Sequence, residues 1–394
     1  MSDFLDALTD TTYQPPKSTQ DIHPSKEWTP RVDTDKGEIV VRTTDVQDEA
    51  ALDWDSHLRQ WGFDPSTFTV QEPVEVRTWD ANTPNGVQTF YYYKARIWRR
   101  HADEDLSGLI DEIRKHRTTK QAPLEGEQTL VVALADWQVG KQDGDGTQGV
   151  VDAVLKLCDQ VPAHVRYLRA SGADVGRLAL LGLGDLVEGC TGSYPSQEFR
   201  IDYDRRDQVK IARRLILKLC QTWAPLFSEV TLAAVPGNHG EHKKNGRPFT
   251  NPGDNDDVAL VEQVAEILAA NPDRYGHIKT VIPRDDISVL LDLSGVGVAL
   301  AHGHVTGRGS QADRAWRWWK DQTHGRQPVG EADVLVTGHF HHLRVVEQGP
   351  RTWIQAPSLD SSEWFQQRYG YGTPSGVLTF TVGNSGWDNL KILR

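Results

Sequence analysis

The stretch that decides the fold is LVVALADWQ at residues 130–138, an apolar run that ends in a carboxylate and a carboxamide. Its apolar part predicts a buried strand. Further apolar runs, each followed by residue types that bind metal ions, occur at residues 178–183, 232–235, 296–301 and 334–337. Ligands collect at the carboxyl ends of strands in open α/β sheets, because these rigid ends open onto a crevice. The five strand ends therefore predict one shared site.

The residues that follow these runs form a mixed set of oxygen and nitrogen donors: Asp136, Gln138, Asp185, Asn238, His302, His339 and His341. Such a set suits Mn, Fe or Zn. If the backbone stays extended at these places, the alternation of side chains sends both members of Asp-x-Gln and of His-x-His to the same side, so that each pair can face one cleft. Two ions about 3.5–4 Å apart would hold one phosphate between them.

The blocks Asp-x-Gln, Gly-Asp, Gly-Asn-His-x-Glu, His and Gly-His-x-His occur in this order along the chain. The series resembles the calcineurin-like metallophosphoesterase superfamily over about residues 129–360. The resemblance implies the fold of that superfamily, a layered α/β β-sandwich of two mixed sheets flanked by helices. Within the superfamily, the chain resembles the nuclease subunits of double-strand-break repair complexes and related phosphoesterases of phages and bacteria.

The resemblance also implies two divalent metal ions and a role for each ligand. A first ligand set would comprise Asp136, Gln138, Asp185 and His341. A second ligand set would comprise Asp185, Asn238, His302 and His339. Asp185 would then bridge the two ions. His239 would lie beside them as the general acid that stabilises the transferring phosphoryl group and protonates the leaving oxygen.

The chain departs from the superfamily pattern at two places. Gln138 stands where the superfamily usually has His, and a carboxamide is the weaker donor, so we expect the first ion to be loosely held. An additional glycine separates His239 from Glu241. This leaves open which acid orients His239, with Asp256 and Asp257 as the alternatives to Glu241.

Residues around the five blocks have two readings each. Glu241 and His304 are candidates for supporting contacts to the ligands, and simple exposure is the alternative for His304. The basic loop with Lys243, Lys244 and Arg247 predicts substrate phosphate contacts as strongly as it predicts a solvated loop. The run WRWWK at residues 316–320 combines aromatic and basic side chains that could stack on bases, although such clusters more often pack in a core.

The chain is expected to divide into a disordered tail over residues 1–35, a small α+β accessory domain with a helical linker over 36–128, and the metallophosphoesterase domain over 129–394. The accessory domain is expected to contain a strand at 38–43, a helix at 48–61 and two strands flanking the turn at 82–86. Helices are predicted at 103–116, 150–169, 206–223 and 257–270.

Composition excludes several classes of protein. A net charge of −12 argues against a uniformly basic nucleic-acid coat, so any nucleic-acid contact must be local. Three scattered cysteines do not make a disulfide framework and are typical of a reducing compartment. The first ten residues lack the features of a secretory signal, and no run approaches about 20 apolar residues. We therefore expect a cytoplasmic protein without a membrane segment.

The function expected from the blocks and the resemblance is metal-dependent hydrolysis of phosphoesters, with a DNA or RNA phosphodiester as substrate and Mn²⁺ as the ion, Fe and Zn being alternatives. A cyclic-nucleotide phosphodiesterase is the alternative enzyme. A non-catalytic scaffold that retains a degraded site is the alternative from another class. Nucleic acid is the expected partner, and a homodimer or a replication or recombination protein is a further candidate.

Overall fold

The structure is a computed structural model that describes residues 31–33, 38–43, 53–60, 62–66, 68–83, 86–99, 122–304, 310–361, 374–383 and 386–394. The helix expected at 103–116 and most of the tail expected at 1–35 lie outside these residues. The chain forms two compact units, Met1–Ser107 and Gly108–Arg394. Each unit is described by itself.

The first unit contains a four-stranded antiparallel sheet with the order β1-β2-β4-β3. Its strands are β1 (Arg31–Asp33), β2 (Glu38–Thr43), β3 (Phe68–Thr83) and β4 (Gly86–Arg99), and its helix is α2 (Trp54–Gln60). The predicted strand at 38–43 and the two strands around the turn at 82–86 are therefore confirmed. The helix predicted at 48–61 covers a shorter segment among the described residues, and β1 lies within the segment expected to be a tail.

Alternation along β4 explains how this small sheet buries one face. Tyr93, Ala95 and Ile97 are buried at every second position, and Leu58 of α2 packs against this face together with Phe68. Successive side chains of a strand point to opposite faces, so the intervening Tyr92 and Lys94 lie on the more exposed side.

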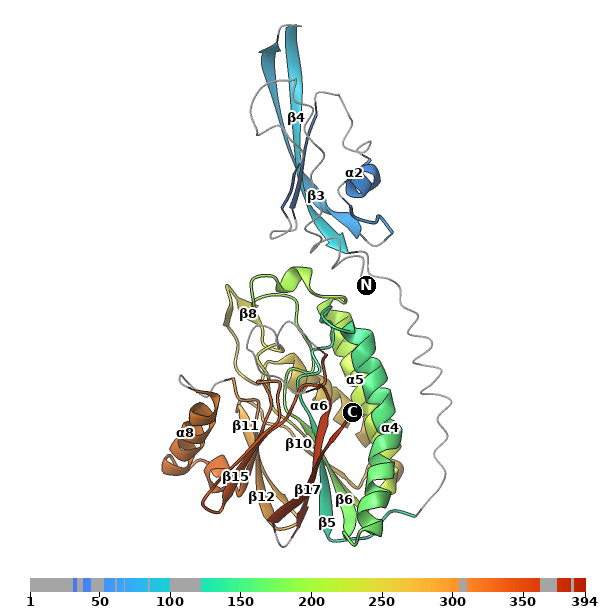
Figure 1. Ribbon diagram of the computed structural model, residues 1–394, viewed down its shortest axis with the longest axis vertical. Coiled ribbons are helices and arrows are strands. Elements are labelled where there is room, and N and C mark those ends of the chain that lie inside the picture. Colours follow the sequence, from blue (N-terminus) through green and yellow to red (C-terminus); the bar gives the residue numbers. More distant parts are fainter. Residues whose placement is uncertain are drawn as a thin grey trace. The chain divides into compact units, whose positions relative to one another are not determined.

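The second unit is built on two mixed sheets (Figure 1). One sheet has the order β10-β7-β6-β5-β16-β17, and its strands are β5 (Gln128–Leu134), β6 (Val175–Gly182), β7 (Glu229–Ala234), β10 (Ile278–Val281), β16 (Val377–Gly383) and β17 (Gly386–Leu393). The other has the order β11-β12-β13-β15-β14, with strands β11 (Ser288–Leu293), β12 (Val296–Ala301), β13 (Val334–Thr337), β14 (Arg344–Gln348) and β15 (Arg351–Gln355).

The core of the second unit lies between the two sheets. Val131 and Ala133 of β5 are buried in the same cluster as Val298 and Leu300 of β12, and all four side chains are at most 1% exposed. Small and branched residues alternate across the interface, which lets the two layers pack closely. The two mixed sheets flanked by helices that the resemblance implies are thus confirmed.

Helices cover the outer faces. The predicted helices appear as α4 (Gly146–Ala170), α5 (Arg205–Trp223) and α6 (Asp256–Ala269), which pack beside the six-stranded sheet. Helix α8 (Gln311–His324) buries Trp316 and Trp319 against β12, β13 and β15. The packing role expected for the tryptophan run is therefore confirmed for these two residues. Among the residues that the structure describes, no helix is long and apolar enough to cross a bilayer.

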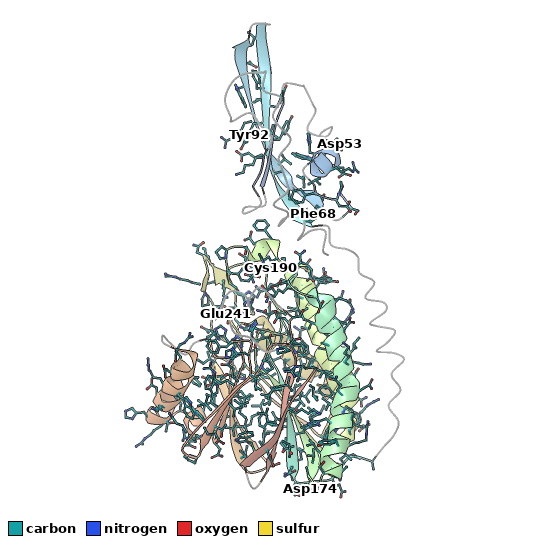
Figure 2. The ribbon with its side chains drawn as sticks, in the orientation of Figure 1. Asp53, Phe68, Tyr92, Asp174, Cys190 and Glu241 are labelled. Atoms are coloured by element: carbon teal, nitrogen blue, oxygen red, sulfur yellow. The ribbon has the colours of Figure 1, made fainter. Side chains whose placement is uncertain are left out.

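Short elements complete the second unit: η2 (Gln197–Phe199), η3 (Ala224–Leu226), β8 (Lys243–Lys244), β9 (Arg247–Pro248), α7 (Pro272–Tyr275) and η4 (Pro328–Glu331). Figure 2 shows Glu241 and Cys190 at one end of this unit and Asp174, which directly precedes β6, at the other. The end with Glu241 carries the loops that follow the parallel strands.

Candidate metal centre

The candidate ligands lie in the loops that leave β5, β6, β7, β12 and β13. Asp185 follows β6 by three residues, and His302 directly follows β12. These two side chains come from different sheets, yet His302 Nε2 lies 2.9 Å from Asp185 Oδ2. Both are fully buried, at 1% exposure. The shared site predicted from the strand ends is therefore formed where the two sheets meet.

The backbone of the ligand loops is not extended. Asp136, Gln138, Asp185, His339 and His341 all have φ between 46° and 70°. The expectation that the Asp-x-Gln and His-x-His spacings act through an extended chain is therefore wrong, because each of these residues sits in a left-handed turn. Non-glycine residues pay on the order of 1–3 kcal/mol for such a conformation, and these strained residues cluster at functional sites.

One glycine is needed for the close approach of two loops. A Cβ atom on Gly237 would lie 2.2 Å from the Asp185 backbone nitrogen and 2.3 Å from its Oδ1. Neither atom can retreat, because Asp185 Oδ1 accepts a 2.7 Å hydrogen bond from the backbone N–H of His239. Gly237 thus lets the loop after β7 lie directly against the carboxylate that both ligand sets share.

The second ligand set is assembled. One ligand atom each from Asp185, His302 and His339 lie within 4.8 Å of one another. Asn238 joins them, since its Oδ1 lies 3.2 Å from His302 Nε2. His302 directs Nδ1 to the Leu183 carbonyl oxygen at 2.7 Å. A proton held on Nδ1 by that carbonyl leaves Nε2 as the nitrogen that faces the set.

Electrostatics in the second set match a cation site. Burial, together with the charge of His302, holds the pKa of His339 well below its usual range, so this imidazole is neutral and keeps a lone pair. Burial opposes protonation of His302 as well, but the Asp185 carboxylate outweighs it and raises the pKa to about 9. The proton shared by His302 and Asp185 thus places positive charge within the second ligand set. A bound metal ion would replace that proton.

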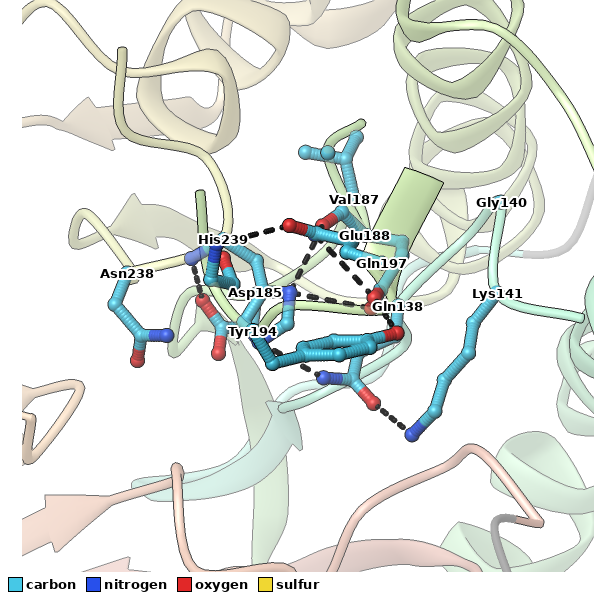
Figure 3. A network of polar contacts seen from close by, with 12 residues as sticks. Gln138, Gly140, Lys141, Asp185, Val187, Glu188, Tyr194, Gln197, Asn238 and His239 are labelled. Atoms are coloured by element: carbon cyan, nitrogen blue, oxygen red, sulfur yellow. Dashed lines mark hydrogen bonds and ion pairs between the residues drawn. The ribbon is translucent and has the colours of Figure 1, made fainter. Parts of the chain in front are cut away.

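The first ligand set is only partly assembled. Asp136 Oδ1 lies 3.4 Å from His341 Nε2, and its carboxylate accepts a 2.9 Å hydrogen bond from the His339 backbone N–H. Gln138 instead directs its Oε1 to the ammonium group of Lys141, at 2.6 Å (Figure 3). Lys141 is buried, and although burial opposes its charge, Asp360 and Glu188 raise its pKa.

His239 lies beside the ligand sets, next to Asp185. Its Nδ1 is 2.8 Å from the Glu188 carbonyl oxygen and 3.1 Å from Glu188 Oε2, and its Nε2 is 3.3 Å from Gln138 Nε2 (Figure 3). Burial opposes the charged ring, but Glu188 and Asp185 outweigh it and raise the pKa of His239 to about 9. Since Lys141 holds the Gln138 oxygen, the amide NH₂ group is the end of Gln138 that faces His239 Nε2.

Glu188 is the acid that orients His239, and the sequence interpretation missed it. Its side chain is fully buried and accepts a 2.7 Å hydrogen bond from the Tyr194 hydroxyl, while Gln197 donates to its backbone oxygen. Glu188 lies in the same loop as Asp185, three residues later. That spacing is the signal that could have found it.

The three acids considered for that role have other partners. Glu241 Oε1 lies 3.6 Å from His304 Nε2, and Asp256 Oδ2 lies 2.6 Å from Arg205 Nε. Asp257 accepts hydrogen bonds from four backbone N–H groups, those of Asp185, Leu186, Val187 and Gly237. Asp257 therefore fixes the loop that carries Asp185, a supporting function that its position at the start of α6 makes possible.

Glu188→Gln is expected to shift the pH dependence of turnover. The substitution removes the charge that raises the pKa of His239, so the fall in activity at alkaline pH, where the acid loses its proton, should move to lower pH. The pH profile of kcat measures this. Glu262→Gln, on the exposed side of α6, is the control with the same chemical change. An unmoved alkaline limb in Glu188→Gln would contradict the role of Glu188.

The basic loop forms the β8–β9 hairpin, and its three cations differ. Lys243 turns inward: its side chain is 8% exposed, and its Nζ donates to the Asn238 carbonyl oxygen and to Ser193 Oγ at 3.0 Å. Lys244 and Arg247 are paired across the hairpin and are exposed. Lys243 thus supports the loop of a candidate ligand, whereas Lys244 and Arg247 are available to a substrate.

His304 stands next to the second ligand set. Its ring centroid lies 5.3 Å from that of His302 and 6.2 Å from that of His339. Burial lowers the pKa of His304 despite its contact with Glu241. His304 therefore places an imidazole ring that contacts Glu241 beside two of the candidate ligands.

Comparisons with known proteins give a fold and little more. No family model matches the chain, and no curated protein matches its sequence. Solved structures that match include a single mutant of Vps29 from Entamoeba histolytica (12% identity, 67% of this chain and 99% of that one, TM-score 0.30) and a predicted phosphoesterase from Streptococcus pneumoniae (13%, 67% and 87%, 0.28). A third is a novel archaeal phosphodiesterase (8%, 68% and 99%, 0.28). Likenesses this distant carry none of the functional argument, which rests on the site.

The residues present fit a divalent metal ion at one of the two positions. The second ligand set offers a carboxylate, a carboxamide and two imidazoles, whose donor atoms converge. One of the imidazoles, His302, has its Nδ1 hydrogen-bonded to the Leu183 carbonyl oxygen. This mixed oxygen and nitrogen set suits Mn, Fe or Zn. The first ligand set offers Asp136 and His341, while its carboxamide oxygen is bonded to Lys141.

Proposed function

We propose that this protein is a metal-dependent phosphodiesterase that hydrolyses nucleic acid, with Mn²⁺ as its ion. The observation that carries the proposal is the group formed by buried Asp185, buried His302 and half-buried His339, with His239 hydrogen-bonded through its backbone to the same Asp185. Metal-assisted cleavage of a phosphoester uses a bound ion and a nearby proton donor. Here the candidate ligands and the candidate acid His239 are joined through the Asp185 carboxylate.

Each residue of the site has a defined task in this reaction. Asp185, Asn238, His302 and His339 would hold an ion that, when bound, supplies Lewis acidity toward phosphoryl oxygens and lowers the pKa of water. His239, held by Glu188 through Nδ1, presents Nε2 to the substrate and protonates the leaving oxygen. Asp257 keeps the backbone of the Asp185 loop in place, so that the carboxylate does not have to reorganise during the reaction.

Nucleic acid is the substrate class that the β8–β9 hairpin supports. The protein carries a net charge of −12, so phosphate contacts must come from local cations. Lys244 and Arg247 are exposed neighbours on the hairpin that follows His239 closely in the chain. These two side chains can bind the phosphates that flank the scissile bond, a contact that a small diester does not offer.

The substrate class is tested with a double variant, Lys244→Ala with Arg247→Ala. We expect DNA or RNA cleavage in Mn²⁺ to weaken much more than hydrolysis of a small chromogenic diester. The salt dependence of nucleic-acid binding should flatten by about one unit of slope for each side chain removed. Lys279→Ala with Arg326→Ala, two exposed cations at other places, is the control of equal charge.

Equal losses on the polymer and the small diester would contradict the nucleic-acid proposal. Efficient hydrolysis of cyclic nucleotides together with inert DNA and RNA would replace it with the small-molecule alternative. A complete lack of phosphoesterase activity in the presence of bound metal would favour the scaffold.

A further inference from the structure

The buried lysine of the site holds the oxygen that a first metal ion would need. Lys141 Nζ lies 2.6 Å from Gln138 Oε1 (Figure 3) and 2.6 Å from Asp360 Oδ2. The Lys141 side chain is 9% exposed and that of Asp360 is 5% exposed. Hydrogen bonds from an ammonium group at this length are strong, and a buried partner is costly to remove. Lys141 is therefore a fixed part of the site.

The contact with Lys141 decides how the Gln138 amide is oriented. A glutamine side chain has one acceptor oxygen and one NH₂ group, and an ammonium group can only donate. The oxygen must therefore face Lys141, and the NH₂ group faces His239 Nε2 at 3.3 Å. An NH₂ group offers no lone pair to a cation. As oriented here, Gln138 is not a donor to the first ligand set.

Asp360 connects Lys141 to the other end of the first set. Its Oδ1 lies 3.5 Å from His341 Nδ1, while its Oδ2 binds Lys141. A carboxylate beside one nitrogen of an imidazole favours the ring orientation in which the other nitrogen faces a ligand. The ammonium group of Lys141 thus contacts Gln138 itself and Asp360, the neighbour of His341, and a second divalent ion at this place would meet its repulsion.

The second ligand set differs from the first in its contacts with basic side chains. None of the hydrogen bonds described for Asp185, Asn238, His302 and His339 joins their side chains to a lysine or arginine. Their ligand atoms converge on one another instead. The two sets that the superfamily pattern treats as equal are therefore unequal in this chain.

We propose that Lys141 is a built-in cation that takes over the charge of the first metal ion, and that the protein binds one divalent ion, at Asp185, Asn238, His302 and His339. Gln138 is part of this arrangement, since its oxygen accepts from the ammonium group in the place of a metal ligand. The inference rests on the metal centre of the proposed function, but it concerns the number of ions and not the reaction.

Metal counting on the full chain tests the inference without an activity assay. Chelator-stripped protein is dialysed against excess Mn²⁺, bound manganese per chain is measured by mass spectrometry, and the electron paramagnetic resonance spectrum is recorded. We expect one ion per chain with the signal of an isolated Mn²⁺. Two ions per chain with a spin-coupled signal would overturn the inference and leave the proposed function standing. No bound ion would overturn both.

A charge-neutral pair of substitutions tests the role of Lys141 itself. Lys141→Met with Asp360→Asn removes both charges together, so that no lone charge remains buried. Freed of the ammonium group, Gln138 can turn its oxygen toward the first set, and the count should rise from one ion to two. Adding Gln138→Ala should return the count to one. Lys218→Met, at another buried lysine on α5, is the control and should bind one ion. A count of one in the double variant, with folding retained, would contradict the role of Lys141.

Discussion

Asp185→Asn is expected to abolish metal binding and to lower turnover by at least about 10³-fold, since metal ions contribute several kcal/mol to phosphoester cleavage. The side chain is buried and contacts His302 at 2.9 Å, so the loss of its charge cannot be made up by water. The Oδ1 contact with the His239 backbone survives in asparagine, which favours retention of the fold. Bound metal and kcat are measured on the same preparation.

The control for this substitution is Asp321→Asn, at an exposed position of α8. It makes the same chemical change far from the ligands in sequence and should leave metal content and turnover unchanged. Full metal content in Asp185→Asn would show that the ion, if bound, uses other residues.

His239→Ala should lower turnover by about 10²-fold or more while metal content stays at the wild-type value. The ring contacts Glu188 and Gln138, and only its backbone N–H contacts Asp185, so its removal takes no donor atom from the second ligand set. The loss should be largest for diesters with a poor leaving group, which need the proton most. A nitrophenolate leaves without one.

Leaving-group dependence therefore separates general acid catalysis from structural support. Equal losses on nucleoside and nitrophenyl diesters, or a site emptied of metal, would contradict the role assigned to His239. Tyr194→Phe serves as a comparison, because it removes the hydroxyl that holds Glu188 and leaves the ring of His239 in place. Its loss should be smaller.

The sequence was sufficient to predict those features that depend on local patterns of residues. The apolar run at 130–135 predicted β5, and the residue types after the five runs predicted which loops meet, because strand ends in such sheets share one edge. Helices such as α5 followed from their apolar periodicity. The positive φ of Asp136 and His339 could not be predicted in this way, because tertiary packing imposes it against local preference.

The unpredicted partners are those brought together across the fold. Asp360 stands 219 positions after Lys141, and neither residue belongs to a block with a recognisable spacing. Lys243 looked like a free cation in the sequence, yet its side chain is turned inward to the Asn238 carbonyl oxygen. Pairings of buried charges depend on which loops the two sheets bring together. The candidate donor residues can therefore be predicted from the sequence, but the residues with which they pair cannot.

The most direct test of the metal-dependent hydrolase is a titration of stripped protein with Mn²⁺ in which bound ion and diester hydrolysis are followed in the same sample. Without metal there should be no hydrolysis, because no residue described at the site replaces the Lewis acid. Activity should then rise in proportion to occupancy, and Asp185→Asn should show neither. Full hydrolysis in metal-free, chelated buffer, or an ion that binds fully without any gain in activity, would contradict the account.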